Sequence, residues 1–215
     1  GKPRPDIFLS LSHYGPGFSP IPFVITVMDL GFLHFPRQFT KKDLYQLKYW
    51  TYWSVKRAAK IITISHFSKK DIIETYHINS KKVVVAYPGF KKTQNLKLKT
   101  QNYNLELKNL KQKYKIKKDY LLYLGTLKPS KNIEGLIKAY KILIDKYQLP
   151  EIDLVIAGKK GWFYENIFKL VKQLNLEDRV IFTDFISDGE VPILMAGAKV
   201  FVMPSFWEGF GIPVL

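Results

Sequence analysis

The end of the chain brings together residue types that could hold a sugar. Residues 204–215 read Pro-Ser-Phe-Trp-Glu-Gly-Phe-Gly-Ile-Pro-Val-Leu and follow an apolar run, Val200–Met203. The glycines on either side of Phe210 let the backbone approach a ligand and turn its N–H groups outward. The carboxylate of Glu208 can accept hydrogen bonds from hydroxyl groups. These residues predict a polar site at the carboxyl end of a parallel strand, with an ordinary turn and a solvated glutamate as the alternative.

A second candidate site lies between a predicted strand and a predicted helix. The strand at residues 121–124 is followed by Gly125 and by residues 126–132, which read Thr-Leu-Lys-Pro-Ser-Lys-Asn. A helix N-terminus presents unpaired N–H groups and the positive end of a dipole, and both favour a bound phosphate. Lys128 and Lys131 add positive charge. We therefore expect an anion site in this loop, and a plain loop with solvated lysines is the alternative.

Two further loops complete the expected ligand edge of this half of the chain. Gly158 and Lys159 follow the next predicted strand, and Phe185 and Ile186 follow the one after it. We single out both pairs as candidate site residues. A loop leading into a helix explains the second pair equally well.

The first half of the chain offers fewer chemical groups. His13 and Tyr14 lie in a loop rich in Gly and Pro after a predicted buried strand at residues 7–11. The loop contains Gly-x-Gly, but Pro20 stands where a dinucleotide fingerprint needs its third glycine, and Pro22 prevents a helix there. A nicotinamide site is therefore rejected. The loop is either a plain connection or an acceptor-side loop carrying His13 and Tyr14.

These candidate residues need elements to position them, and strand and helix patterns alternate twice along the chain. That alternation favours an α/β fold with two Rossmann-like parallel-sheet domains, both incomplete in this chain. We place an N-terminal domain at residues 1–90 and a C-terminal domain at 119–215. Residues 91–118 are expected to be a lysine-rich linker that contributes little to a core, with a short helix at about residues 105–114.

One helix of the first domain is unusually aromatic. It begins with a capping-box-like Thr40-x-x-Asp43 and is expected to run to about Lys60. Packing in the core is the default interpretation of its aromatic side chains, which are Tyr45, Tyr49, Trp50, Tyr52 and Trp53.

Composition limits the function classes. The 215-residue chain has a net charge of +16 and no cysteine, which excludes disulfides and thiolate metal sites and fits a reducing compartment. The histidines show no metal-ligand spacing, and no apolar run reaches the ~18 residues of a membrane span. Residues 91–118 carry ten lysines against one acid. Solvation is the first interpretation of that run, an anionic membrane surface the second and nucleic acid the third.

The closing segment resembles the signature of retaining glycosyltransferases of family 4, which have the GT-B fold. In that family two glutamates separated by seven residues form the donor-binding motif. Glu208 matches the first glutamate, Gly209–Leu215 are the spacers, and the second glutamate would be the next residue. We therefore expect an internal fragment truncated at both ends, which is inactive in isolation. The resemblance covers nearly the whole chain except the lysine-rich segment.

The anion loop resembles the family's Gly-x-x-x-Pro-Arg-Lys-Asn segment. Lys131 matches the lysine that holds the donor diphosphate. Thr126 and Ser130 occupy the two positions in which the family can carry its arginine, and Lys128 is the candidate to supply the missing charge. In the first domain, Met28 stands where the family often has a histidine near the donor sugar.

The resemblance implies transfer of a sugar from a nucleotide diphosphate to a glycan or lipid-linked acceptor, with retention. Mannose from GDP-mannose is the first expectation, because the motifs resemble bacterial polysaccharide mannosyltransferases, and a UDP-sugar is the second. No cofactor or metal is expected, since the Asp-x-Asp of the other large glycosyltransferase fold is absent. The expected location is the cytoplasm, with peripheral contact at an anionic inner-membrane surface as a further expectation. No nucleic-acid partner is expected.

Two rival classes remain open. They are a non-catalytic sugar-nucleotide-binding module and a basic protein that binds nucleic acid or a membrane surface. Under the main interpretation the residues fall into three groups. The catalytic group is Glu208, Lys131 and Asp29, although helix capping explains Asp29 equally well. The acceptor-side group is His13 and Tyr14. The donor-binding group is Gly125, Thr126, Lys128, Ser130, Lys131, Gly158, Lys159, Phe185, Ile186, Glu208, Gly209, Phe210 and Gly211.

Overall fold

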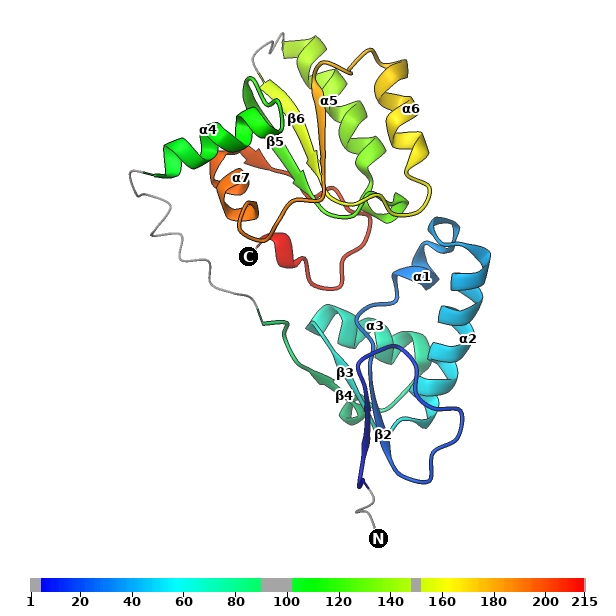
Figure 1. Ribbon diagram of the computed structural model, residues 1–215. Helices are drawn as coiled ribbons and strands as arrows, with labels where there is room; N and C mark the ends of the chain where they lie inside the picture. The colour runs from blue at the N-terminus through cyan, green and yellow to red at the C-terminus, as the bar shows by residue number, and fades with distance from the viewer. Residues whose placement is uncertain (1–4, 90–101, 148–151, 215) are drawn as a thin grey trace. The chain divides into compact units, whose positions relative to one another are not determined.

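The chain divides into two compact units, each built on a parallel sheet. A computed structural model describes residues 5–89, 102–147 and 152–214. One unit comprises residues 1–90 together with 207–215, and the other comprises residues 91–206. Each described sheet has four strands, and every strand pair in it is parallel (Figure 1). The predicted α/β class with two Rossmann-like parallel sheets is confirmed.

The first unit has its strands in sequence order, β1-β2-β3-β4. The strands are β1 (Phe8–Ser10), β2 (Phe23–Thr26), β3 (Lys60–Thr63) and β4 (Val83–Val85). The helices are α1 (Gly31–His34), α2 (Lys41–Arg57) and α3 (His66–Tyr76), with 3₁₀ turns at Pro36–Gln38 and Ser80–Lys82. A single core forms where alternate strand residues such as Ile25 and Ile61 meet Val55 of α2 and Ile72 of α3.

Helix α2 begins where the sequence predicts and ends earlier. The Thr40 hydroxyl accepts the Asp43 N–H at 3.2 Å and donates to the Asp43 carboxylate at 2.7 Å, so Thr40 is the N-cap residue of α2, as the sequence predicts. The helix stops at Arg57 because Ala58 has an extended backbone, and Lys60 already opens β3. The expected end at Lys60 was therefore three residues too late.

Two expectations about burial in the first unit were wrong. The strand predicted at residues 7–11 is present as β1, but the side chains of Phe8 and Leu9 are exposed rather than buried. Among the described strands β1 lies at the edge of the sheet beside β2, and both of these residues are exposed. The aromatic side chains of α2 are also exposed, because the helix turns its small and β-branched residues Thr51, Ser54 and Val55 to the core.

The second unit has a different strand order, β7-β6-β5-β8. Its strands are β5 (Asp119–Leu124), β6 (Ile152–Ala157), β7 (Val180–Asp184) and β8 (Val200–Phe201). Its helices are α4 (Tyr103–Lys113), α5 (Ile133–Tyr147), α6 (Glu165–Gln173) and α7 (Val191–Gly197), with a 3₁₀ turn at Pro129–Lys131 before α5. From β5 the chain moves outward through β6 to β7 and then returns to place β8 on the other side of β5. The boundary between β5 and β8 is therefore a topological switch point.

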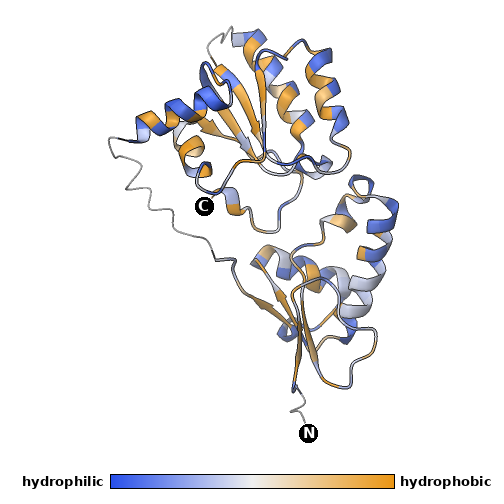
Figure 2. Cartoon of the chain, viewed as in Figure 1, coloured by the Kyte–Doolittle hydropathy of each residue, from blue (hydrophilic) through white to orange (hydrophobic). Residues whose placement is uncertain are grey.

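Helices cover both faces of the second sheet. Helices α5 and α6 lie on one face, and α4 and α7 lie on the other (Figure 1). Alternate residues of one strand serve the two cores, so Tyr123 points to the α5 side and Leu122 to the α4 side. Figure 2 shows the strands as the most hydrophobic part of this unit. A strand buried on both faces reads as a continuous apolar run, which explains why residues 154–157 are recognisable as a strand in the sequence, although β6 begins two residues earlier.

The expected linker at residues 91–118 needs correction in its second half. Helix α4 matches the short helix expected there, but it is not a solvated connection. Leu110 of α4 is 7% exposed, Ile116 is 4% exposed, and both belong to the core under the sheet. Lysines on the outer side of the helix hid this apolar contact in the sequence. Residues 207–215, expected in the second domain, group with the first unit instead.

The described helices are too short or too polar for a bilayer. None of them combines the length and the apolar content of a membrane span.

Candidate functional site

The loops after β5 and β8 meet at the switch point of the second sheet. The N–H of Phe206 donates to the carbonyl of Ser130 at 3.0 Å, and Asn132 Nδ2 donates to the carbonyl of Pro204 at 3.1 Å. Residues 128–132 and 204–206 therefore form one surface at the carboxyl edge of the sheet, where open α/β folds bind ligands. The structure brings the anion loop and the start of the closing segment together.

Asn132 shapes the anion loop and the start of α5. It has a left-handed backbone with φ of +53° and follows the 3₁₀ turn that ends at Lys131. A Cβ at position 135 would lie 2.3 Å from Asn132 Oδ1, so Gly135 is required for the asparagine to lie over the first turn of α5. Helix α5 begins at Ile133, and its positive dipole end lies next to Lys131. This arrangement suits an anionic ligand.

Two glycines let the neighbouring loops approach each other closely. Gly125 and Gly158 have φ of +154° and +148°, and a Cβ on Gly158 would lie 2.0 Å from the Gly125 carbonyl oxygen. The N–H of Gly125 donates to Ala157, and the N–H of Gly158 donates to Asp184, both at 2.9 Å. The ends of β5, β6 and β7 are therefore hydrogen-bonded side by side, as the shared edge predicts.

The lysines of this edge lie over aromatic rings. Lys128 Nζ lies 5.0 Å from the centroid of Trp162, and Lys159 Nζ lies 4.5 Å from that of Phe185. Two residues predicted separately, Lys159 and Phe185, thus contact each other. Ile186 is buried in the core on the α4 side, so only its backbone can face a ligand.

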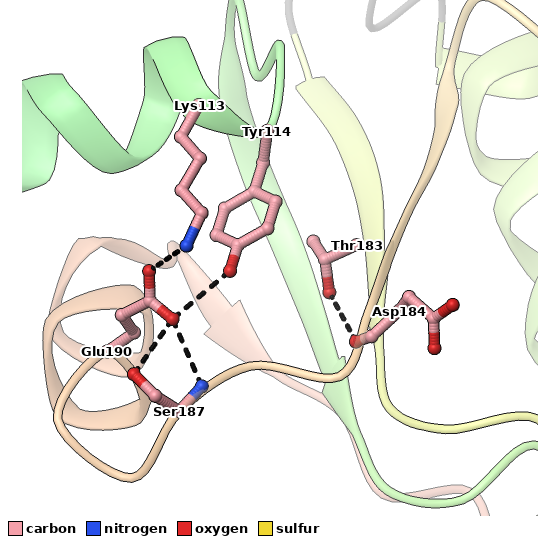
Figure 3. Close-up of polar contacts among 6 residues, drawn as sticks. All are labelled: Lys113, Tyr114, Thr183, Asp184, Ser187 and Glu190. Carbon is pink, nitrogen blue, oxygen red and sulfur yellow. Dashed lines mark hydrogen bonds and ion pairs between the residues drawn. The ribbon is translucent and has the colours of Figure 1, made fainter.

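A carboxylate that the sequence reasoning missed fixes the loop after β7. Glu190 accepts hydrogen bonds from the Ser187 N–H at 3.0 Å, the Ser187 hydroxyl at 2.9 Å and the Tyr114 hydroxyl at 3.2 Å, and it pairs with Lys113 (Figure 3). The hydrogen bond from Lys113 and those from Ser187 hold the pKa of Glu190 at about 2. Helix α4 is thereby tied to the loop that carries Phe185 and Ile186.

The closing segment continues onto the first unit. The Trp207 indole stacks on His34 with ring centroids 4.2 Å apart and also contacts Phe67 at 5.0 Å. Two residues later, a Cβ on Gly209 would lie 3.0 Å from the Met28 carbonyl oxygen. Glu208 lies between these two anchors in the sequence.

The predicted turn residues have distinct positions in this segment. Phe210 packs against Tyr87 with centroids 5.8 Å apart. Gly211 has φ of +85°, which favours glycine. The Gly209 carbonyl accepts a hydrogen bond from the Ser68 hydroxyl at 3.4 Å. The segment is therefore held by its backbone and its aromatic residues.

His13, Met28 and Asp29 meet at the carboxyl edge of the first sheet. The Met28 N–H donates to His13 Nε2 at 3.4 Å. Burial lowers the pKa of His13, and the nearby Asp29 opposes this effect. Within the described residues His13 Nδ1 is buried and has no hydrogen-bond partner. Asp29 Oδ1 accepts the N–H of Gly31 at 2.8 Å, so it also has the helix-starting role weighed as the alternative.

Comparison with known proteins identifies the chain. Residues 106–215 match the family model of glycosyl transferases group 1, and residues 2–93 match that of Glycosyltransferase Family 4. The chain belongs to the glycosyl transferases group 1 family. Its relatives include O-antigen chain mannosyltransferase B of Escherichia coli, 29% identical over 89% of this chain and 49% of that protein. O-antigen chain mannosyltransferase RfbU of Salmonella typhimurium is 31% identical over 88% and 47%. The chain thus spans about half the length of these relatives.

Solved structures agree with the fold of this group 1 glycosyl transferase. WaaG, described as a glycosyltransferase involved in lipopolysaccharide biosynthesis, superposes with a TM-score of 0.72 at 20% identity, over 98% of this chain and 56% of WaaG. Anabaena Alr3699/HepE in complex with UDP and glucose gives 0.65 at 23% identity, over 89% and 48%. These likenesses establish the GT-B fold, which confirms the resemblance noted in the sequence.

Several structural residues of this glycosyl transferase were missed by the sequence reasoning. Asn132 and Glu190 hold loops at the carboxyl edge of the second sheet, and Trp207 packs against His34 and Phe67 within the first unit. The contact between Asn132 and Gly135 could have been predicted from the sequence, because a glycine in the first turn of a helix leaves room for a side chain of the preceding loop. Among residues 5–89, 102–147 and 152–214 there is no group of three or more His, Asp or Glu that could hold a metal ion.

Proposed function

We propose that this chain is the donor-binding portion of a glycosyltransferase that moves a sugar from a nucleotide diphosphate to a glycan or lipid-linked acceptor with retention. The observation that carries the proposal is the hydrogen-bonded pair of loops at the β5–β8 switch point. One loop carries Lys131 at the start of α5, and the other leads directly into Glu208. The anion loop at the carboxyl edge of this sheet suits the phosphate groups of such a donor.

The roles follow from the chemistry of each group. Lys131 and the N-terminus of α5 stabilise negative charge on the departing diphosphate. Glu208 and the backbone amides of Phe210 and Gly211 hold hydroxyl groups of the sugar. Asp29 lies at the end of β2, close to Gly209, and contributes a second carboxylate. Catalysis on this model is positioning and electrostatic stabilisation, without a required metal ion.

The proposed donor is GDP-mannose, with a UDP-sugar as the second candidate. The two O-antigen mannosyltransferases among the relatives support mannose. The Anabaena protein was solved with UDP and glucose, and its low identity to this chain makes it weaker support. A glycan or lipid-linked acceptor is proposed on the same relatives, with His13 and Tyr14 on the acceptor side.

Donor binding can be tested on this chain. Saturation-transfer difference NMR detects weak ligands, and it would compare GDP-mannose, UDP-glucose and GDP at equal concentration. We expect GDP-mannose to give the strongest signal. Lys131→Ala should weaken binding by about 1.5–3 kcal/mol, the range for a charge-assisted hydrogen bond, or roughly tenfold to a hundredfold. Lys138→Ala, an exposed lysine on α5, is the matched control and should leave binding unchanged.

Two outcomes would change the proposal. Equal binding by Lys131→Ala and the parent would remove Lys131 from the site. If a longer form of the protein binds the donor but neither releases GDP nor transfers the sugar, the non-catalytic module is favoured. The reason for keeping this alternative is that Met28, Thr126 and Ser130 stand where the family has other residue types.

A further inference from the structure

The outer face of α2 is aromatic and basic. Tyr45, Tyr49, Tyr52 and Trp53 recur at i, i+4, i+7 and i+8, which places them on one side of the helix. With Trp50 they are between 46% and 63% exposed. The opposite side holds the buried residues of the helix. Tyrosine and tryptophan have intermediate hydropathy, so α2 is largely pale or blue in Figure 2 although its surface carries large rings.

The charge of this face has one sign. Helix α2 contains five basic residues and one acid, Asp43. Lys48 Nζ lies 5.7 Å from the ring of Tyr49, and Lys56 Nζ lies 5.7 Å from that of Tyr52. The lysines and rings are therefore interleaved on one surface. We call this surface the α2 aromatic face and define it as Lys42, Tyr45, Lys48, Tyr49, Tyr52, Trp53 and Lys56.

An apolar hollow opens on the flank of α2 beside this face. It has a volume of about 450 Å³ and is lined by Trp50, Trp53 and Arg57 of α2 and by the loop at Gly15 and Gly17. The Gly15 N–H donates to the Ser54 hydroxyl at 2.9 Å, which fixes the loop against the helix. The hollow extends the apolar area available on the α2 side of the first unit.

We propose that the α2 aromatic face docks the protein on an anionic lipid bilayer. Tyrosine and tryptophan are the side chains that concentrate at the membrane interface, because each has an apolar ring and a polar group that remains hydrated. Lysines beside them are attracted to an anionic surface. A face made of these residue types lies at the headgroup level and does not insert as a span.

The face is connected to the acceptor side of the first unit. Tyr14 packs edge-on against Trp50 with centroids 5.6 Å apart, and it neighbours His13. A lipid-linked acceptor held in the same bilayer would reach the loop that carries these residues. This last step rests on the proposed function, whereas docking on the bilayer does not.

The proposal differs from the membrane interpretation of the lysine-rich segment 91–118. It assigns contact to α2, on which large rings accompany the lysines. Sedimentation with vesicles tests it in the absence of any donor, so failure of the proposed transfer would not affect the result. Vesicles of phosphatidylcholine alone and of phosphatidylcholine with phosphatidylglycerol supply the neutral and anionic surfaces.

The expected result is binding to the anionic vesicles with a blue shift of tryptophan fluorescence. The double variant Tyr49→Ser/Trp53→Ser should lower the partition coefficient about tenfold or more, because it removes two interfacial rings. Lys42→Gln/Lys48→Gln should reduce the difference between anionic and neutral vesicles. The matched control is Ile142→Ser/Tyr147→Ser, which alters two equally exposed residues of α5 and should bind as the parent does.

Thermal unfolding separates docking from folding. The altered side chains of α2 are exposed, so each variant should unfold within a few degrees of the parent. Three results would overturn the proposal. The first is full vesicle binding by Tyr49→Ser/Trp53→Ser, and the second is loss of binding only when lysines of 91–118 are replaced by glutamine. The third is binding of a single-stranded oligonucleotide by this face with none to vesicles, which would assign the face to stacked bases.

Discussion

Replacing Glu190 with glutamine tests whether one carboxylate holds the loop after β7. The side chain accepts three hydrogen bonds from Ser187 and Tyr114 and pairs with Lys113. Glutamine keeps one acceptor oxygen and directs an NH₂ group at donors. A hydrogen bond to a charged group contributes about 1.5–3 kcal/mol when buried, but Lys113 is largely exposed and its pair adds little. We therefore expect Glu190→Gln to lower the free energy of unfolding by about 1–2 kcal/mol at pH 7.

The same contacts predict a pH dependence with a definite sign. The pKa of Glu190 is lowered to about 2 from its ordinary value of 4.5. Its contribution to stability is therefore complete above pH 4.5 and is lost as the pH falls through about 2. Glutamine does not titrate, so the difference between parent and variant should be constant from pH 7 to 5 and shrink below pH 4.5.

Urea denaturation followed by circular dichroism measures this difference at pH 7, 4 and 3. Glu177→Gln, an exposed glutamate of the same unit, is the control and should match the parent within about 0.5 kcal/mol. The reasoning would be refuted if the Glu190→Gln variant had the same free energy of unfolding as this control at pH 7 and the same dependence of that free energy on pH below 4.5. In donor-binding assays the variant should also lose affinity, because Ser187 follows the predicted donor contacts Phe185 and Ile186.

Three further substitutions or titrations test other parts of the structure. Gly158→Ala should destabilise the protein by about 2–4 kcal/mol, because the new Cβ would meet backbone atoms at a residue with positive φ. In the control Gly189→Ala the new Cβ has no atom within 4 Å, so stability should not change. Equal urea midpoints for the two variants would contradict this. Leu110→Ala should cost about 2–3 kcal/mol and the exposed Leu105→Ala almost nothing, and a neutral Leu110→Ala would restore α4 to the linker. In an NMR titration the pKa of His13 should lie below its ordinary value of 6.5, because burial disfavours the charged ring. The unfolded chain then takes up the proton first, so the free energy of unfolding should fall as the pH drops below 6.5. A His13 pKa above 6.5 would exclude the buried position.

The carboxyl edge of the second sheet could be predicted largely from sequence, because its strands are buried on both faces and stand out as apolar runs. The loop residues between Gly125 and Asn132 follow one such run directly, and their position follows from the rule for parallel sheets. What the sequence did not reveal was the pairing across the edge. The bond from Asn132 to Pro204 depends on the strand order, and no local pattern encodes that order.

The errors have a common physical origin in amphipathic segments. The leucines of α4 alternate with lysines, so α4 looked like a solvated linker even though Leu110 packs in the core under the sheet. In α2 the opposite occurred. Its rings looked like core residues, while the helix packs on the core through its aliphatic residues Leu44, Leu47 and Val55. Glu190 was missed because its partners Lys113 and Tyr114 lie far away in sequence.

The strand order of the second unit also has a consequence for the order in which the protein is made. β8 pairs with β5 through Leu121–Val200 and Leu122–Phe201, and all of β6, β7, α5, α6 and α7 is synthesised between them. A nascent chain that ends before Val200 can pair β5, β6 and β7 but leaves one edge of β5 open, which is a surface prone to pairing with other chains. Contacts so distant in sequence form slowly. The switch point is thus assembled late, and a ligand of the proposed kind that binds there would stabilise the folded unit by mass action.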